Sequence, residues 1–360
     1  MNAEVSLFFT LSKEFIVSNP HIWILCAISF AISAISIFFV IKICNKFGWY
    51  DSTNERKVHK GNIPRLGSIG FVGAYVIVSI IYLVMQKEAR TSQIPIIAAG
   101  FLIFIFGILD DFLELKAIFK LIVQIISALI IVLNGYVFTS IGNLVFPIWF
   151  RYVLTFGWIL GIINAFNLID GIDGLCGGLS TLIMITLSVI YMRATTHPAA
   201  NCLFLAFALM GFLVYNKPKA KIFMGDGGSQ FLGFMMAVLP LYQTSENFEY
   251  NKFLIMLNLV SIPMLDTIAA IWRRKREHRG IMTPDKQHLH HKLMQLGLST
   301  TQILNVLLSL QFIICLVCGI AMYMKGFEAF ILLLSLYIVI ILLFCTVHFL
   351  YKRSLTSQVN

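Results

Sequence analysis

Apolar residues run in long blocks along almost the whole chain, separated by short polar segments. Most blocks come close to the about 20 residues that a helix needs to cross the hydrocarbon of a bilayer. The first block is too long for a signal-peptide core and lacks a small-residue cleavage site, so we take it as a true span. The pattern therefore predicts an all-α, polytopic integral membrane protein. The eleven predicted spans cover residues 22–44, 67–86, 94–109, 117–133, 150–167, 178–193, 199–215, 229–242, 253–272, 302–323 and 327–350.

The composition agrees with this class, and the basic residues predict an orientation. Of 360 residues, 59% are hydrophobic and only 12% are charged, against about 25% charged residues in soluble proteins. With the N-terminus outside, 20 of the 27 Lys and Arg residues fall on one side, which the positive-inside rule makes cytoplasmic. The net charge of +10 then suits anionic lipid head groups and anionic substrates. Nucleic acid is a weaker partner, because no soluble domain is large enough to dock it.

The aspartates predict where the chemistry lies. All eight fall on or near the inferred cytoplasmic side, whereas the glutamates lie on both sides. We therefore expect a single transmembrane domain over residues 1–360 with one acidic site facing the cytoplasm. It would carry an external segment at 1–20, a large cytoplasmic loop at 273–300 and a cytoplasmic tail at 351–360.

The stretch Asn164–Gly178, NAFNLIDGIDGLCGG, is the strongest candidate for a site. Asp170 and Asp173 follow an apolar run, and acidic groups at such a place usually serve a ligand, an ion or a pathway. The glycines between them let backbone amides approach a phosphate closely. An ordinary capped helix end is the alternative. Four polar groups interleaved with four glycines favour a site.

Two further acidic motifs fall on the same predicted face. Asp110 and Asp111 in GILDD repel one another unless a cation lies nearby, and on a helix they point roughly 100° apart. Lys120 could contact a lipid phosphate or simply anchor the interface. Asp226 lies in a glycine turn, GDGGS, just before a predicted span, where it could hold Mg²⁺ bridging to an anion or act as an N-cap.

Basic loops complete the candidate site. Residues 46–66 are either an ordinary basic cytoplasmic loop, as the positive-inside rule predicts, or a loop whose Lys and Arg side chains bind a diphosphate. The largest loop contains TPDKQHLHHKL, whose histidines suit phosphate binding better than zinc, since only Asp285 is placed as a fourth zinc ligand. Asp266 in the preceding span could pair with one of the arginines at 273–276, or it could be functional.

These motifs, in this order along residues 45–300, resemble those of the polyprenyl-phosphate N-acetylhexosamine-1-phosphate transferase family, glycosyltransferase family 4. The five motifs read DSTNERKVH with IPRLG, GILDD, NAFNLIDGIDGL, IFMGDGGS and PDKQHLHH. The HLHH string is similar to the branch that uses UDP-GlcNAc-type donors.

The resemblance implies a reaction in the bacterial inner membrane. N-acetylglucosamine-1-phosphate would pass from UDP-GlcNAc to undecaprenyl phosphate, giving undecaprenyl-diphospho-GlcNAc and UMP, as the first membrane step of a cell-surface polysaccharide. It also implies Mg²⁺, with Mn²⁺ as an alternative, and a homodimer is an open option. Other UDP-N-acetylhexosamines (GalNAc, QuiNAc, FucNAc) or phospho-MurNAc-pentapeptide are alternative donors. Outside the class, a secondary transporter is the alternative, but it would place its acids near the bilayer midplane.

By the same resemblance each motif residue receives an expected role. Asp110, Asp111 and Asp226 would be catalytic, with Asp226 and Asn167 as metal ligands. The expected nucleotide-binding residues are Asn167, Asp170, Gly171, Ile172, Asp173, Asn216 and Phe223. The expected phosphate- and sugar-binding residues are Asp51, Lys60, Lys120, Arg273, Arg274, His288, His290 and His291.

Overall fold

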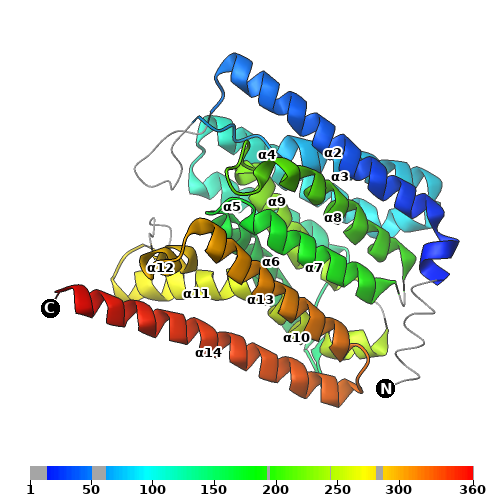
Figure 1. The fold of residues 1–360 in the computed structure, drawn as a ribbon. Coiled ribbons are helices and arrows are strands. Elements are labelled where there is room, and N and C mark those ends of the chain that lie inside the picture. Colours follow the sequence, from blue (N-terminus) through cyan, green and yellow to red (C-terminus); the bar gives the residue numbers. More distant parts are fainter. Residues whose placement is uncertain (1–13, 51–61, 193–194, 244, 281–286, 360) are drawn as a thin grey trace.

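A computed structural model describes residues 14–50, 62–192, 195–243, 245–280 and 287–359, which are almost entirely helical (Figure 1). The helices and strands are α2 (Pro20–Phe47), α3 (Ser68–Met85), η1 (Lys87–Ala89), α4 (Arg90–Leu113), α5 (Ala117–Leu133), β1 (Ser140–Ile141), β2 (Leu144–Val145), α6 (Ile148–Ile169), α7 (Leu175–Tyr191), α8 (Thr196–Asn216), α9 (Gly225–Val238), η2 (Leu239–Leu241), α10 (Glu246–Leu259), α11 (Ser261–Arg276), α12 (Leu289–Gln295), α13 (Thr300–Ala321) and α14 (Gly326–Val359).

The helices match the predicted spans. Each of the eleven predicted spans falls on helix, although residues 229–242 cover most of α9 and all of η2, and residues 253–272 fall on α10 and α11. Among the described residues, seven helices are long and apolar enough to cross a membrane, and the bent pair would make an eighth. The prediction of an all-α polytopic membrane protein is confirmed, while the number of crossings and the orientation stay predictions.

The break between α10 and α11 was not predicted. The two helices meet at a bend of 64°. Pro263 lies in the first turn of α11, where its missing N–H leaves no helical hydrogen bond unmade. A helix can therefore begin there but cannot continue unchanged from α10. The bend places α11 against α6 on one side and against α14 on the other.

The short helix α9 lies at the centre of the bundle, packed against α4 and α6 (Figure 1). Its close neighbours require glycine. A Cβ on Gly107 of α4 would lie 2.4 Å from the Gly227 Cα, and one on Gly233 would lie 2.6 Å from the Ile163 Cα of α6. Small residues let helix backbones approach this closely inside a membrane. The first turn of α9, which carries Asp226, is thereby held between two other helices.

Two elements lie at the periphery. Strands β1 and β2 form a small antiparallel hairpin, with Ser140 opposite Val145, and the Gly142 N–H donates to the Tyr250 carbonyl of α10 at 3.0 Å. Helix α14, red in Figure 1, runs along one edge beside α11 and α13 and leaves most of its apolar side chains exposed. An apolar, exposed helix of this length is expected to face lipid.

Candidate active site

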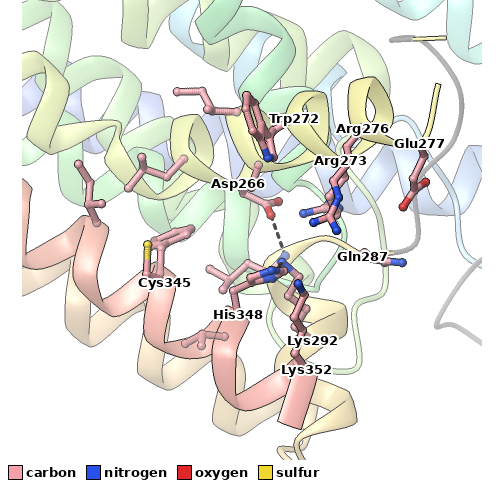
Figure 2. Close-up of a pocket in the computed structure, with 17 residues that line it drawn as sticks. Asp266, Trp272, Arg273, Arg276, Glu277, Gln287, Lys292, Cys345, His348 and Lys352 are labelled. Carbon is pink, nitrogen blue, oxygen red and sulfur yellow. Dashed lines mark hydrogen bonds between the residues drawn. The ribbon is translucent and has the colours of Figure 1, made fainter. Parts of the chain in front are cut away.

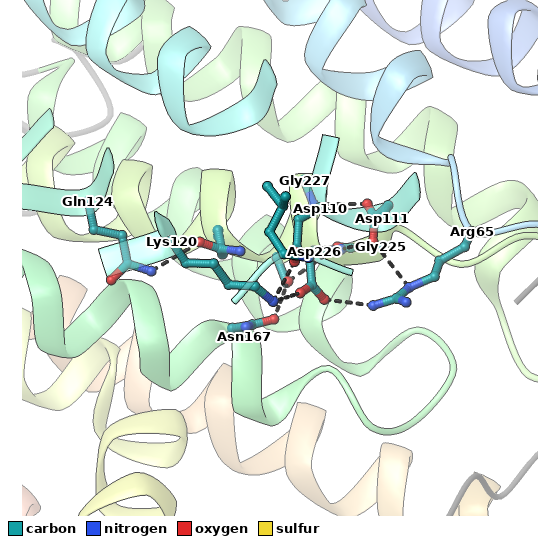
Figure 3. Close-up of polar contacts among 12 residues, drawn as sticks. Arg65, Asp110, Asp111, Lys120, Gln124, Asn167, Gly225, Asp226 and Gly227 are labelled. Carbon is teal, nitrogen blue, oxygen red and sulfur yellow. Dashed lines mark hydrogen bonds and ion pairs between the residues drawn. The ribbon is translucent and has the colours of Figure 1, made fainter. Parts of the chain in front are cut away.

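Four separate segments bring charged side chains to one point (Figure 3). The C-terminal end of α4 supplies Asp110 and Asp111, and the first turn of α9 supplies Asp226. The first turns of α5 supply Lys120, and the segment before α3 supplies Arg65. Three carboxylates and two cations therefore meet although they lie up to 161 residues apart in sequence.

Asp226 is paired with both cations. Its Oδ1 accepts a hydrogen bond from Arg65 Nη2 at 2.8 Å, and its Oδ2 accepts one from Lys120 Nζ at 2.9 Å. Burial by itself raises the pKa of Asp226, but the contact with Asp110 and the charges of Arg65 and Lys120 outweigh it and lower the pKa to about 2. The group is therefore an anion at neutral pH, able to accept further cations or donors.

Asp111 holds the glycine turn in place. Its Oδ1 accepts from the Asp226 N–H at 2.8 Å and from Arg65 Nε at 3.2 Å, while its Oδ2 accepts from the Gly227 N–H at 3.1 Å. The turn itself needs Gly225, whose φ is +73° and whose Cβ would lie 2.4 Å from Asp111 Oδ2. With its side chain only 1% exposed, Asp111 is buried and fully engaged.

Asp110 is buried on the other side of α4. Its Oδ1 accepts from the Leu115 N–H at 2.9 Å and its Oδ2 pairs with Lys120. The side chain is 4% exposed, whereas Lys120 is 27%, Arg65 31% and Asp226 17% exposed. The groups within reach of a substrate are consequently Asp226 and its two cations.

A cavity of about 440 Å³ opens beside this cluster. Arg65 and Asp111 line one side of it, and Trp49 and Phe112 line another. The two aromatic rings lie 5.4 Å apart, edge to face. The cavity thus places the Arg65–Asp111 ion pair opposite aromatic side chains at the end of α4, and Glu114 also lines it.

Polar side chains also connect α6, α9 and α5 behind the cluster. Ser229 Oγ donates to Asn167 Oδ1 at 2.8 Å, which places Asn167 against the first turn of α9. Gln124 Nε2 donates to Gln230 Oε1 at 3.0 Å, and Asn164 Nδ2 donates to Gln124 Oε1 at 2.9 Å. Gln124 and Gln230 are buried, and buried amides are costly unless they are hydrogen-bonded, so these contacts fix how the three helices lie against one another.

The glycine-rich turn after α6 lies next to the cluster. Burial first, and the neighbouring charge of Asp226 second, raise the pKa of Asp170 to about 7, while Arg65 offsets part of the rise. Gly171 packs directly against the histidine-rich segment, since a Cβ there would lie 2.6 Å from His290 Cε1. The ring centroid of His291 lies 4.2 Å from the ring centroid of His290.

The histidine-rich segment is anchored by Asp266. His288 Nδ1 and Asp266 Oδ2 lie 2.9 Å apart, and the Leu289 N–H donates to Asp266 Oδ1 at 2.8 Å. The sequence offers an arginine of residues 273–276 as a partner for Asp266, whereas the structure shows His288 paired with it. Asp266 caps the start of α12, and an anion is favourable at a helix N-terminus. Burial, followed by the charge of His291, lowers the pKa of His290 to about 4.

Three expected nucleotide-binding residues have contacts within the protein. The Gly174 N–H donates to Asn216 Oδ1 at 3.0 Å and Asn216 Nδ2 donates to the Ile222 carbonyl at 2.8 Å, so both ends of this amide brace the turn. The Ala220 N–H donates to Asp173 Oδ2 at 3.0 Å. Ile172 is buried in the apolar core.

The remaining expected residues lie at the edges of the site or outside the described ranges. Phe223 is half-buried, and its backbone pairs with Pro64 and Gly67. Arg274 is buried, and Arg273 faces a cavity between α11 and α14. The positions of Asp51, Lys60 and Asp285 fall outside the described residues.

The oxygen donors at the cluster suit a divalent cation. Within the described ranges, no group of three or more His, Cys, Asp or Glu side chains is arranged to hold a metal ion. Mg²⁺, however, usually binds through one or two carboxylates together with substrate phosphates and water. Each Asp226 oxygen has a lone pair beyond the one used by Arg65 or Lys120. Asp226 therefore fits such a cation, and Asn167, whose Oδ1 accepts from Ser229 Oγ, lies against the same turn.

Several contacts were not predicted from the sequence. The sequence shows Arg65 only as one charge of a basic loop, yet Arg65 joins two of the three carboxylates. Ser229 is part of the GDGGS motif, but the sequence does not indicate its hydrogen bond to Asn167. Gln124 could have been found, because it is the one amide in a largely apolar run, and such a residue usually pairs with a polar group of another helix.

The chain is similar to known proteins over most of its length. The family model described as glycosyl transferase family 4 matches residues 93–244. A Bacillus subtilis (strain 168) protein named as a probable undecaprenyl-phosphate N-acetylglucosaminyl 1-phosphate transferase is 36% identical over 288 residues, covering 76% of this chain and 78% of that protein. An Escherichia coli (strain K12) undecaprenyl-phosphate alpha-N-acetylglucosaminyl 1-phosphate transferase is 30% identical, covering 76% of each chain.

A third relative acts on a decaprenyl phosphate according to its name. The decaprenyl-phosphate N-acetylglucosaminephosphotransferase of Mycolicibacterium smegmatis (strain ATCC 700084 / mc(2)155) is 32% identical, covering 70% of each chain. Identity of this level over most of both chains means a common fold and family. The chain is therefore an enzyme of the phosphotransferase type, not a secondary transporter, and it belongs to glycosyl transferase family 4.

Proposed function

We propose that the protein transfers N-acetylglucosamine-1-phosphate from UDP-GlcNAc to undecaprenyl phosphate at the carboxylate cluster. The observation that carries this proposal is the partly exposed triad of Asp226, Lys120 and Arg65, in which one anion lies between two cations. The names of the Bacillus subtilis and Escherichia coli relatives give the same acceptor and the same sugar phosphate. A nucleotide sugar and a polyprenyl phosphate are both anionic, and both need cationic groups to hold them.

The chemistry is an in-line exchange at phosphorus. An oxygen of the lipid phosphate forms a bond to the sugar-bearing phosphorus, and the bond from that phosphorus to the UMP oxygen breaks, so that UMP leaves with the electron pair. Lys120 and Arg65 are 27% and 31% exposed, and both lie within hydrogen-bonding distance of Asp226. They would hold the two phosphates side by side, which supplies positioning and charge compensation. A lipid phosphate is already partly ionised at neutral pH, so no strong base is required.

Asp110 and Asp111 would act as positioning residues. Both are nearly inaccessible and both have each oxygen paired, Asp111 with the glycine turn and Asp110 with Leu115 and Lys120. Asp111 then sets the direction of Asp226, and Asp110 sets that of Lys120. The lipid phosphate would meet these carboxylates only through the cations they hold.

Asp226 and Asn167 would hold Mg²⁺. When bound, the ion would offset charge on the diphosphate and on the departing UMP. Gly171 and His290 are in contact, so the glycine-rich turn and the histidine-rich segment would bind the same substrate molecule. His290, with its pKa lowered to about 4, is neutral at pH 7 and can accept or donate a hydrogen bond.

We also propose the bacterial inner membrane as the location, with the cluster facing the cytoplasm, where nucleotide sugars are made. The support is that Asp110, Asp170 and Asp226 all lie at helix ends on the predicted basic side. The homodimer stays a prediction.

The test is product formation by the purified protein. UMP release from UDP-GlcNAc should require Mg²⁺ and undecaprenyl phosphate together, and mass spectrometry should find the diphospho-GlcNAc lipid. Asp226→Asn should abolish transfer. Full activity of this variant would remove Asp226 from the site, and UMP release without lipid would indicate a hydrolase. A panel of UDP-sugars in the same assay would decide between GlcNAc and another N-acetylhexosamine.

A further inference from the structure

A second cavity, of about 700 Å³, lies between α11, α12 and α14 (Figure 2). It shares no lining residue with the cluster of Asp110, Asp111, Lys120 and Asp226. One part of its wall is apolar and includes Ile268, Trp272, Ile341 and Phe344. Ile268 and Trp272 are 51% and 68% exposed, so the apolar part is open at the surface of α11.

The other part of the wall is strongly basic. Arg273 and Arg276 come from the last turn of α11, Lys292 comes from α12, and Lys352 comes from the end of α14 (Figure 2). Lys292 Nζ lies 3.4 Å from Nδ1 of His348, which also lines the cavity. Cationic groups from three helices thus gather at one end of an apolar groove.

The acidic groups in the wall are already engaged. Asp266 uses one oxygen for His288 and the other for the Leu289 N–H. Glu277 pairs with Arg279 at 2.9 Å. The wall therefore offers an incoming molecule a net positive charge and no carboxylate suited to chemistry.

We propose that this cavity binds an anionic glycerophospholipid of the surrounding bilayer, with its phosphate at Arg276, Lys292 and Lys352 and an acyl chain along the apolar wall. The charge and the apolar surface are complementary to the two ends of such a lipid. Few residues of the apolar helix α14 are buried, so the groove beside it is open to hydrocarbon. The reacting polyprenyl phosphate is not this occupant, because its phosphate must reach Lys120 and Asp226 in the proposed reaction.

The site would connect lipid composition to the transferase site through α12. This helix of seven residues carries Lys292 on the cavity wall, while His290 packs on Gly171. Asp266 belongs to the cavity wall and also fixes the start of α12. A phosphate bound by Lys292 would therefore steady the histidine-rich segment.

Cys345 provides a direct probe of occupancy. It lines the cavity and is exposed, whereas the other six cysteines are buried. We would measure its reaction with N-ethylmaleimide, a neutral reagent, in the full chain embedded in nanodiscs of phosphatidylcholine alone or mixed with phosphatidylglycerol. With phosphatidylglycerol at about ten times its dissociation constant, labelling should slow about tenfold, since only the empty fraction reacts.

A matched pair of double variants separates the site from general surface charge. Arg276→Gln with Lys352→Gln removes two charges from the wall, and Lys275→Gln with Arg353→Gln removes two exposed charges from the same helices outside it. Protection by phosphatidylglycerol should be lost in the first pair and kept in the second.

Three outcomes would overturn the proposal. They are equal labelling rates in both bilayers, equal behaviour of the two double variants, and stronger protection of Cys345 by polyprenyl phosphate than by phosphatidylglycerol. Each is read from labelling and not from UMP release, so failure here leaves the proposed transfer reaction to its own test.

Discussion

Replacing Asp111 with Asn exchanges one carboxylate oxygen for an NH₂ group and leaves the shape of the side chain unchanged. In the native protein the two oxygens accept from the Asp226 and Gly227 backbone N–H groups and from Arg65. The amide has only one oxygen. Its NH₂ group would face a backbone N–H, so one buried donor loses its partner and the others lose a charged acceptor.

The cost follows from these contacts. A hydrogen bond to a charged group contributes about 1.5–3 kcal/mol, and a buried donor left unpaired costs about 1–3 kcal/mol. Breaking a buried ion pair typically costs about 3–5 kcal/mol. We therefore expect Asp111→Asn to lower the free energy of unfolding by about 3 kcal/mol. At about 2 °C per kcal/mol for a chain of this size, the apparent melting temperature should fall by about 6 °C.

The assay compares stability and transfer in two variants. Asp226→Asn changes a more exposed carboxylate and should lower the melting temperature by much less, but it should abolish UMP release. Asp111→Asn should be the less stable protein, yet well below its melting temperature it should retain measurable transfer. Intrinsic tryptophan fluorescence during heating, measured in detergent alongside UMP release, gives both quantities.

The opposite result would refute the reasoning. If Asp111→Asn melted like the wild-type protein and had no activity, Asp111 would act on the substrate directly. If both variants were stable and inactive, the division into a partly exposed carboxylate that meets the substrate and a buried one that positions it would be wrong.

Two further predictions concern packing and pH. Gly107→Ala should push α4 away from Gly227 and reduce the rate of transfer at least tenfold. Gly73→Ala is the control, because a Cβ at Gly73 meets nothing within 4 Å, and it should leave the rate unchanged. A normal rate in Gly107→Ala would contradict the close approach of the two helices. His290 has its pKa lowered to about 4 in the folded protein, against about 6.5 in the unfolded chain. The unfolded chain therefore binds the proton first, and stability should fall by up to about 3 kcal/mol as the pH drops from 6.5 to 4. His290→Gln should flatten this part of a melting-temperature profile, and an unchanged slope would show that another group is responsible.

The sequence by itself determined the class of protein and most of the candidate residues. Hydrophobic runs report membrane spans because the bilayer imposes its thickness on each helix independently of the others. The acidic motifs could be recognised because a charged side chain next to an apolar run is energetically costly and usually serves a function. From these local signals the eleven apolar runs, the glycine-rich turn and Asp110, Asp111 and Asp226 could be named as candidates.

The tertiary structure decided which carboxylate faces outward and which is buried. The sequence does not distinguish the roles of Asp110 and Asp111, which are adjacent and chemically identical. On α4 their side chains point in different directions. Only the packing of α4 against α9 shows that Asp111 accepts hydrogen bonds from the turn that carries Asp226. In the same way Arg65 joined the cluster and Asp266 paired with His288. Such contacts join segments far apart in the chain, so they depend on how whole helices pack and leave no periodic trace in the sequence.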